Sequence, residues 1–324
     1  MIVRFGLDEL PGLLRELGSE RPLVVTTQRW RSLPLPGPER YANVRRHVPA
    51  DTVEEATAAA GGCDALVAVG GGSAIDTAKA VSARTGLPVV AVPTTYAGAE
   101  WTGGFGVRDE ARGVKTGGAG ARPAAIVYEV GLTLTLPPSE TGGTAMNALA
   151  HCVEALYVEG RNEEAERDAL AGARLISRAL PRVLADGRDR DARGELLEGA
   201  MHAGAALGAA GLGLGHAMAQ ALGGRYGLPH GALNAVCLPA ALRFTAPVAS
   251  EEVARLGEAM GVEDAVERVE ELARLAGFRR LRDLGVPEDA LDEVGAEAAR
   301  RPGARANPRQ ATAAEVARLL RSAW

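Results

Sequence analysis

The first 140 residues alternate short apolar runs with longer mixed segments. Runs of four or five consecutive apolar residues predict buried strands, and the segments between them predict helices. The predicted strands are 23–27, 65–69, 89–92 and 125–128, and the predicted helices are 53–60 and 74–83. This alternation is typical of a parallel sheet covered by helices.

From Thr144 onward the pattern is helical almost to the last residue. Gly, Pro and charged breaks separate segments rich in Ala, Leu, Glu and Arg. The predicted helices are 144–158, 163–185, 192–210, 212–222, 230–244, 250–260, 263–277, 287–299 and 312–323. A chain of 324 residues is long enough for two domains. We therefore expect an α/β fold with a parallel-sheet domain at 1–140 and an all-helical domain at 141–324.

Three glycines, Gly70, Gly71 and Gly72, join the predicted strand 65–69 to the predicted helix 74–83. A strand that ends in glycines and enters a helix leaves backbone N–H groups open to a phosphate. Ser73 and Asp76 have the spacing of a capping box, which would satisfy the first amides of the helix. A plain tight turn is the alternative, because the sequence is not the G-x-G-x-x-G fingerprint of dinucleotide-binding turns.

Two further segments follow predicted strands, Thr26-Thr27-Gln28 and Pro93-Thr94-Thr95-Tyr96. In parallel sheets, ligands bind at the carboxyl ends of the strands. We expect these segments to share one sheet edge with the glycine turn.

Composition excludes several classes of protein. The net charge of −5 and the lack of a basic stripe argue against a nucleic-acid partner. No long uncharged apolar run or signal-peptide pattern predicts a membrane segment or export, so a cytoplasmic location is expected. The three cysteines are widely separated, which fits reduced packing residues better than disulfides or a zinc cluster.

Three of the five histidines are placed to converge: His151, His216 and His230. His151 follows Asn147 by one helical turn, so both side chains face the same way. His216 and His230 are separated by a break at Gly223-Gly224 and Pro229, which lets the chain double back. Such a trio could hold Fe²⁺ or Zn²⁺, bind an anionic substrate or move a proton. Asn147 is the weak point of a metal site, because a neutral amide is a poor ligand for a hard cation.

Only two lysines, Lys79 and Lys115, stand among 36 basic residues. Where arginine occupies nearly every other basic position, a remaining lysine can mark a site that requires a compact ammonium group. We expect Lys115 to be the functional one and Lys79, one turn into the helix, to reach solvent or the ligand site. Lys115→Arg should then damage turnover far more than Lys79→Arg.

Four motifs in order make the chain resemble the iron-containing alcohol dehydrogenase family over nearly its whole length. They are Gly70–Lys79, Pro93–Glu100, Asn147–His151, and His216 with Leu228-Pro229-His230. Within that family the chain resembles the maleylacetate reductases, through Thr-Thr-Tyr-Ala-Gly in the second motif, Asn147 in place of Asp, and the ending from Ala306-Asn307-Pro308-Arg309 to Ala323-Trp324.

The resemblance implies a dehydroquinate synthase-like architecture, with NADH or NADPH on the sheet domain, a helical catalytic domain, and the active site between them. It also implies a small-molecule substrate and a homodimer. The implied cofactor residues are Gly70, Gly71, Gly72, Ser73, Asp76, Thr94, Thr95 and Thr27. The catalytic candidates are His151, His216, His230, Lys115 and Tyr96, and the same three histidines are the candidate metal ligands. Thr27 stands where NAD-preferring relatives have Asp, so NADPH should be tolerated.

The implied reaction reduces maleylacetate to 3-oxoadipate by hydride transfer to an activated double bond. Negative charge then collects on the ketone oxygen, where fixed hydrogen-bond donors can stabilise it without a metal. The alternative is a metal-dependent alcohol dehydrogenase or aldehyde reductase of the same family, in which Fe²⁺ or Zn²⁺ acts on an alkoxide. Asn147 favours the first reaction.

Two hypotheses from other classes remain open. Gln220 and Asn234 replace histidines that the resemblance leads us to expect, and Ala240 replaces another. A cofactor-binding protein with little turnover would fit these losses. A synthase on the same scaffold, like the dehydroquinate synthases, would need more lysines around a metal than this chain has.

Overall fold

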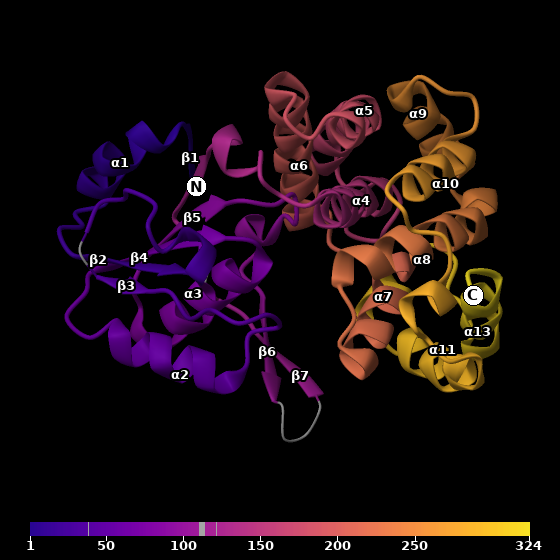
Figure 1. The fold of residues 1–324 in the computed structure, drawn as a ribbon. Helices are drawn as coiled ribbons and strands as arrows, with labels where there is room; N and C mark the ends of the chain where they lie inside the picture. The colour runs from indigo at the N-terminus through magenta and orange to yellow at the C-terminus, as the bar shows by residue number, and fades with distance from the viewer. Residues whose placement is uncertain (38, 110–113, 121) are drawn as a thin grey trace. The chain divides into compact units, whose positions relative to one another are not determined.

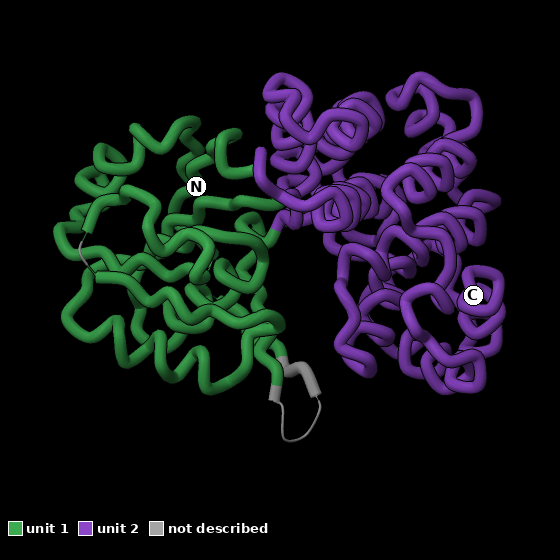
Figure 2. Tube along the Cα trace, viewed as in Figure 1, with its two compact units in different colours: residues 1–95, 99–133 green, residues 96–98, 134–324 purple. Residues whose placement is uncertain are grey.

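The computed structural model describes residues 1–37, 39–109, 114–120 and 122–324, with the backbone alone at 109 and 114–116. The chain divides into two compact units (Figure 2). The first comprises residues 1–95 and 99–133, and the second comprises residues 96–98 and 134–324. The short segment 96–98 therefore belongs to the second unit although the first surrounds it in the sequence.

The first unit is built on a parallel sheet of six strands within the described residues. The spatial order is β1-β8-β5-β4-β2-β3. The strands are β1 (Ile2–Phe5), β2 (Pro22–Thr26), β3 (Arg40–Tyr41), β4 (Ala65–Gly70), β5 (Val89–Pro93) and β8 (Ala125–Tyr128). Every residue of β2, β4, β5 and β8 is buried. These strands read as continuous apolar runs because both faces of the sheet are covered.

Helices cover the two faces of this sheet (Figure 1). Helices α2 (Ala50–Ala59) and α3 (Gly72–Thr85) pack on one face, and α1 (Leu10–Glu16) packs on the other. A small antiparallel hairpin, β6 (Phe105–Asp109) and β7 (Val114–Gly118), follows β5. Short 3₁₀ helices occupy Leu7–Glu9, Gln28–Trp30, Ala99–Trp101 and Val130–Leu132.

All regular secondary structure in the described residues of the second unit is helical. Its helices are α4 (Pro138–Ala155), α5 (Glu163–Ala185), α6 (Arg190–Ala210), α7 (Leu214–Tyr226), α8 (His230–Thr245), α9 (Ser250–Met260), α10 (Ala265–Leu275), α11 (Leu291–Ala299), α12 (Pro302–Ala306) and α13 (Ala313–Ser322). Its 3₁₀ helices are Ala246–Val248, Leu281–Leu284 and Glu288–Ala290. Helix α4 packs against α5, α6 and α8, which places its side chains at the centre of the unit.

One stretch of the described chain, His230–Val248, is long and apolar enough to cross a membrane by length and composition. It contains α8, and 72% of the tested window is buried inside the fold. Its apolar character is accounted for by the core that α8 forms with α7, α11 and α13.

The predicted fold class is confirmed, since a parallel-sheet region precedes a helical one. The predicted strands and long helices fall where the structure has them, within four residues at their ends, except that α4 begins at Pro138, six residues before the predicted start at Thr144. The sequence interpretation missed β1, β3, the β6–β7 hairpin, α1 and α12.

Candidate cofactor and catalytic residues

The glycine turn lies at the carboxyl end of β4 and requires small residues for two physical reasons. Gly70 has φ +152°, and a Cβ there would lie 2.7 Å from the Cβ of Ala74. A Cβ on Gly71 would lie 3.0 Å from Cγ2 of Thr95. The turn therefore packs against Ala74 of α3 and against Thr95 in the segment after β5. Its backbone can approach a ligand where a side chain would not fit.

The predicted capping box is wrong, because Gly71 occupies the N-cap position and no side chain caps α3. Ser73 lies inside the helix, where its backbone is helical and the box geometry is not available. Asp76 is also engaged elsewhere: Oδ1 pairs with Lys79 Nζ at 3.0 Å and Oδ2 accepts from the amide of Gly106. No side chain therefore caps the amides of Gly72 and Ser73 at the start of α3.

The three ligand segments share one edge of the sheet, as the strand register shows. Thr26 pairs with Val69 across β2 and β4, and Gly70 pairs with Pro93 across β4 and β5. Thr27, the glycine turn and Thr94-Thr95 therefore leave neighbouring strands at the same level. Thr94 is buried and donates its amide to the carbonyl of Gly70, whereas Thr27 and Thr95 are partly exposed. A dinucleotide could lie along this edge.

The expectation that Lys79 reaches solvent or the ligand site is wrong, because its side chain is fully buried. Its Nζ pairs with Asp76 and donates to the carbonyl oxygens of Ala99 at 2.8 Å and Thr102 at 3.3 Å, and also to that of Gly104. These oxygen atoms form a cage around the ammonium group, and the hydrogen bonds link α3 to the segment between β5 and β6. Lys115 lies in β7 opposite Arg108, and its side chain is outside the described residues.

The three predicted histidines come together inside the helical unit. The rings of His151 on α4 and His216 on α7 stack with centroids 4.8 Å apart and planes 13° apart. The His230 ring, at the start of α8, lies 5.7 Å from that of His216 at 50°. Pro229 at the N-cap ends the turn after α7 and starts α8, as the sequence pattern predicts.

Two asparagines lie among the imidazoles and hydrogen-bond to each other. Asn234 Nδ2 donates to Asn147 Oδ1 at 2.6 Å and contacts His230 Nε2 at 3.1 Å. Asn147 Nδ2 donates to the carbonyl of Ala97 at 3.1 Å and contacts His151 Nε2 at 3.4 Å. Because each amide nitrogen is a donor, the facing Nε2 atoms of His151 and His230 accept. A neutral His151 ring then carries its proton on Nδ1.

Glu154 is a site residue that sequence reasoning missed. It is fully buried, and its Oε2 lies 2.6 Å from His216 Nδ1. Its two oxygens also accept from the amides of Gly213 and His216. The carboxylate therefore holds the Nδ1–H of His216 and turns Nε2 away from itself. The signal in the sequence was a lone acid, three residues after His151, in an otherwise uncharged stretch of helix.

Three polar atoms in this cluster are buried and lack a hydrogen-bond partner within the described residues. They are His151 Nδ1, His216 Nε2 and Asn234 Oδ1. A buried polar atom without a partner costs roughly 1–3 kcal/mol, so a group of three indicates a ligand with polar atoms. Burial, and then the neighbouring His216 and His230, lower the pKa of His151 well below its ordinary value. His151 is neutral near pH 7 and offers one N–H.

In the part of the chain that the structure describes, the imidazole cluster lacks the free carboxylate that usually completes a divalent metal site. Among the described residues, no group of three or more His, Cys, Asp and Glu side chains is arranged to hold one. Next to the imidazoles, a metal site would need a negatively charged ligand. The residue there is Asn147, whose side chain is a neutral amide and whose oxygen already accepts from Asn234. Glu154 is committed to His216 and two backbone amides.

Tyr96, a predicted catalytic residue, is fully buried. Its hydroxyl accepts from Nη1 of Arg193 at 3.1 Å. Because the hydroxyl is buried and bonded to Arg193, it is suited to fix the backbone around Tyr96 rather than to contact a substrate. Gln220, which stands where a histidine is expected, lies partly exposed on α7.

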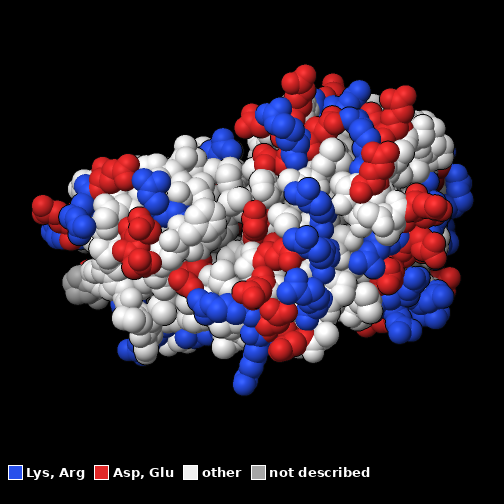
Figure 3. All heavy atoms as spheres, turned by 90° about the horizontal axis from the view of Figure 1, so that it is seen from above, with Lys and Arg blue, Asp and Glu red and all other residues white. Residues whose placement is uncertain are grey.

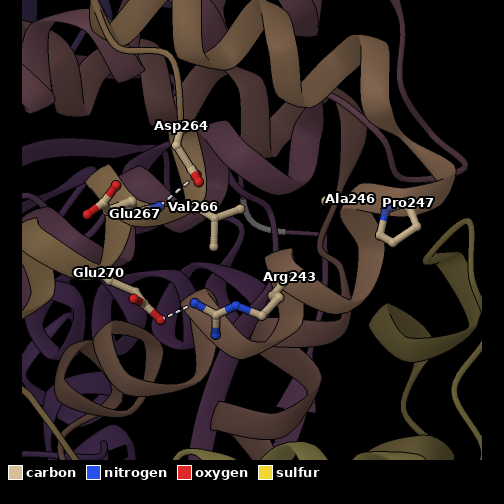
Figure 4. A pocket seen from close by; sticks show the side chains of 7 residues that line it. All are labelled: Arg243, Ala246, Pro247, Asp264, Val266, Glu267 and Glu270. Carbon is tan, nitrogen blue, oxygen red and sulfur yellow. Dashed lines mark hydrogen bonds and ion pairs between the residues drawn. The ribbon is translucent and has the colours of Figure 1, made fainter.

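One hollow on the second unit is lined by none of these residues. It has a volume of about 560 Å³ and is lined by side chains of α8, α10 and the segments beside them (Figure 4). Arg243 and Glu270 pair with each other there, and Asp264 caps α10. On the face shown in Figure 3, acidic and basic side chains are interspersed. Neither feature competes with the imidazole cluster as a site.

Comparison with known proteins agrees with this geometry. Residues 3–129 match the family described as iron-containing alcohol dehydrogenase, and residues 141–324 match the Fe-containing alcohol dehydrogenase family, C-terminal. The chain belongs to the iron-containing alcohol dehydrogenase family and is an oxidoreductase. Within that family it is maleylacetate reductase-like.

Three relatives carry the narrower assignment. The chain is 39% identical to a maleylacetate reductase of Pseudomonas knackmussii and 36% identical to one of Burkholderia cepacia, each covering 99% of this chain and 95% of the relative. The crystal structure of maleylacetate reductase from Rhizobium sp. strain MTP-10005 superposes with a TM-score of 0.92 at 32% identity, covering 100% of this chain and 95% of that one.

Proposed function

We propose that the protein is an NADH- or NADPH-dependent maleylacetate reductase that forms 3-oxoadipate. The observation that carries the proposal is the Asn147–Asn234 hydrogen bond among three imidazoles. A neutral pair at this position suits a reaction in which the protein itself stabilises charge. The names of the relatives at 36% and 39% identity support the same substrate.

The edge formed by β2, β4 and β5 fits a nicotinamide dinucleotide. Gly70, Gly71, Gly72 and Ser73 would hold the pyrophosphate, Thr94 and Thr95 would line the nicotinamide side, and Thr27 would lie near the adenosine ribose. When bound, the reduced nicotinamide supplies the hydride. Asp76 would support the turn through Lys79 and Gly106 rather than touch the dinucleotide.

The imidazole cluster would stabilise the charge that the reaction creates. Addition to the double bond leaves negative charge on the ketone oxygen of the substrate, which requires donors already in place. His151 Nδ1–H is such a donor, since it is buried, neutral and without a partner in the described residues. Loss of one such donor commonly costs about 10²–10³ in rate.

His216 is suited to hold the proton that completes the reduction. Its Nδ1 is bound to the Glu154 carboxylate, which fixes the ring, and its Nε2 is left for the substrate. His230, oriented through Asn234, would face the same substrate from α8. Lys115 stays a catalytic candidate on sequence grounds alone. Tyr96 would position its segment.

Several properties complete the proposal. The substrate is a small molecule, and we expect a homodimer in the cytoplasm. We place the boundary between the dinucleotide-binding and catalytic domains at residue 140. The second candidate function, a metal-dependent alcohol dehydrogenase or aldehyde reductase, is favoured by the unpartnered nitrogens of His151 and His216.

One experiment separates the two functions. Purified protein is analysed for metal, treated with a chelator, and assayed with maleylacetate and NADPH or NADH by the loss of nicotinamide absorbance. Full activity after chelation supports the proposed reductase. Loss of activity that returns with Fe²⁺ or Zn²⁺ supports the dehydrogenase. Cofactor binding without turnover would contradict both.

A further inference from the structure

Arg193 on α6 is the largest side chain in the fully buried interior, with only 2% of it exposed. Every hydrogen bond that it makes to the described residues goes to a neutral oxygen. Nε donates to the carbonyl of Gly187 at 3.0 Å, Nη1 donates to Tyr96 Oη at 3.1 Å and Thr141 Oγ1 at 3.0 Å, and Nη2 donates to the carbonyl of Leu136 at 3.3 Å. A buried charge without a carboxylate partner is costly.

The geometry of the guanidinium explains why this position holds arginine. Its planar fork reaches three separate segments at once: the turn before α6 at Gly187, the start of α4 at Leu136 and Thr141, and the hydroxyl of Tyr96. A lysine ammonium could not reach all three directions. Arg193 therefore joins parts of the chain that are far apart in sequence.

The segment Tyr96–Gly98 is the part of this network that touches the site residues. The carbonyl of Ala97 accepts from Asn147 Nδ2. Gly98 has φ +78°, and a Cβ there would lie 3.4 Å from Cε1 and Nδ1 of His151. The Tyr96 amide also donates to Thr144 Oγ1 at 3.4 Å. The backbone of these three residues thus borders the unpartnered Nδ1 of His151 and orients its neighbour Asn147.

We propose that Arg193 is a positioning residue that acts through the Tyr96 hydroxyl. It fixes the Tyr96–Gly98 backbone against Asn147 and His151, and so sets the orientation of the one N–H that His151 offers. Nothing in the motif pattern of the chain points to Arg193. The kinetic part of its test rests on the proposed reductase function, and the spectroscopic part does not.

The sharpest variant is Tyr96→Phe, which removes the hydroxyl and keeps the ring. With ¹⁵N-labelled histidine, the side-chain resonances of His151 should shift, while those of His202, which pairs with Asp168, should not. Turnover of maleylacetate should fall between about ten- and a hundred-fold in kcat, since small misplacements of reacting groups cost that much, with KM for NADPH unchanged. Arg193→Lys, which keeps the charge and loses the fork, should show the same pattern.

Tyr157→Phe is the matched control. It also removes a buried tyrosine hydroxyl on the second unit, but one without a hydrogen-bond partner in the described residues. Its His151 resonances and kcat should equal those of the unmodified protein. The proposal is overturned if Tyr96→Phe leaves both His151 signals and kcat as they are in this control. If Arg193→Lys does not fold, Tyr96→Phe decides alone. If the unmodified protein has no reductase activity, the proposed function fails while the resonances still test the positioning.

Discussion

The side-chain amide of Asn234 donates to Oδ1 of Asn147 at 2.6 Å, which joins α8 to α4 between the rings of His151 and His230. Each amide also contacts one imidazole, so the pair sets the proton positions of two histidines. A carboxylate at residue 147 could accept from Asn234 but could no longer donate to Ala97 or His151. Residue 147 therefore needs a side chain that both donates and accepts hydrogen bonds, as asparagine does.

Asn147→Asp should turn the cluster into a metal site. The new carboxylate would join three imidazoles, a donor set that suits Zn²⁺ or Fe²⁺. We expect the variant to retain zinc after dialysis, measured by elemental analysis, and to lose about 10²-fold in maleylacetate turnover, because His151 Nε2 loses the amide that orients the ring. Asn147→Leu is the control that loses the donor without gaining the charge. Equal zinc in the unmodified protein and in Asn147→Asp would contradict this interpretation.

Gly71→Ala should weaken cofactor binding without unfolding the protein. The new methyl group would meet Thr95 at 3.0 Å and push the turn from its position. NADPH binding, measured by quenching of protein fluorescence or by calorimetry, should weaken at least about tenfold, which corresponds to about 1.4 kcal/mol. Gly12→Ala on α1 is the matched control, because its Cβ would meet nothing closer than 3.9 Å. Weakening of equal size in both variants would argue against the glycine turn as the phosphate site.

Thr27→Asp should move cofactor preference from NADPH towards NADH. Thr27 follows β2 at the same sheet edge as the glycine turn. A carboxylate there would bind the ribose hydroxyls of NADH and repel a 2′-phosphate. The ratio of kcat/KM for NADPH to that for NADH should fall at least about tenfold, or about 1.4 kcal/mol. Thr27→Ser should leave the ratio unchanged, and an unchanged ratio in Thr27→Asp would place the ribose elsewhere.

Lys79→Arg should destabilise the sheet unit, in contrast to the tolerance expected from sequence. The ammonium group lies between Asp76 and the carbonyls of Ala99, Thr102 and Gly104, where a larger planar group does not fit. Overpacking of this kind costs roughly 1–3 kcal/mol in the free energy of unfolding, measured by urea denaturation. Arg84→Lys, at an exposed position on the same helix, should change little. A normal unfolding midpoint for Lys79→Arg would show that the cage adapts.

Glu100→Gln should stabilise the protein increasingly as pH rises above about 4.5. Glu100 is buried and accepts from the hydroxyl of Tyr128 at 3.0 Å. Burial raises the pKa of this carboxyl above its ordinary value of 4.5. The folded state therefore binds the proton more tightly than the unfolded state, and its stability falls as pH rises from the ordinary pKa through the raised one.

The measurement is the free energy of unfolding at several pH values between 5 and 8, at about 1.4 kcal/mol for each unit of pKa shift. Glutamine removes the ionisation, so the difference between variant and unmodified protein should widen over this range. Glu54→Gln, at an exposed position on α2, is the control for replacing a carboxylate by an amide. A constant difference for Glu100→Gln would mean that the carboxyl ionises as easily in the folded protein as in the unfolded one.

Much of the fold could be predicted because its signals are local. Helix α5 was expected at 163–185 and lies there, since Asn162 caps it, three acids fill its first turn and the chain breaks at Asp186. The elements that were missed have weak local patterns. Strand β1 is four residues long and half-exposed, β3 has two residues, and the β6–β7 hairpin contains charged and glycine positions in place of an apolar run.

The candidate site could be predicted only in part. The histidines were found because their spacing and the break at Pro229 are visible in the chain. Glu154 could not be linked to His216, because 62 residues separate them in sequence and only the packing of α4 against α7 brings them together. The capping box at Ser73 and Asp76 was predicted from residue spacing alone. Spacing does not show where a helix begins, and α3 begins earlier, with Gly71 at its N-cap.

Because residues 96–98 leave one unit for the other and return, the backbone crosses between the units three times, at 95/96, 98/99 and 133/134. A chimaera joined at a single junction near residue 133 would bring this tripeptide from one parent and its partners Asn147, His151 and Arg193 from the other. Recombining the halves of related enzymes should therefore succeed only when the tripeptide is inherited together with the helical half, and a helical half expressed alone would carry a gap where Tyr96 now sits.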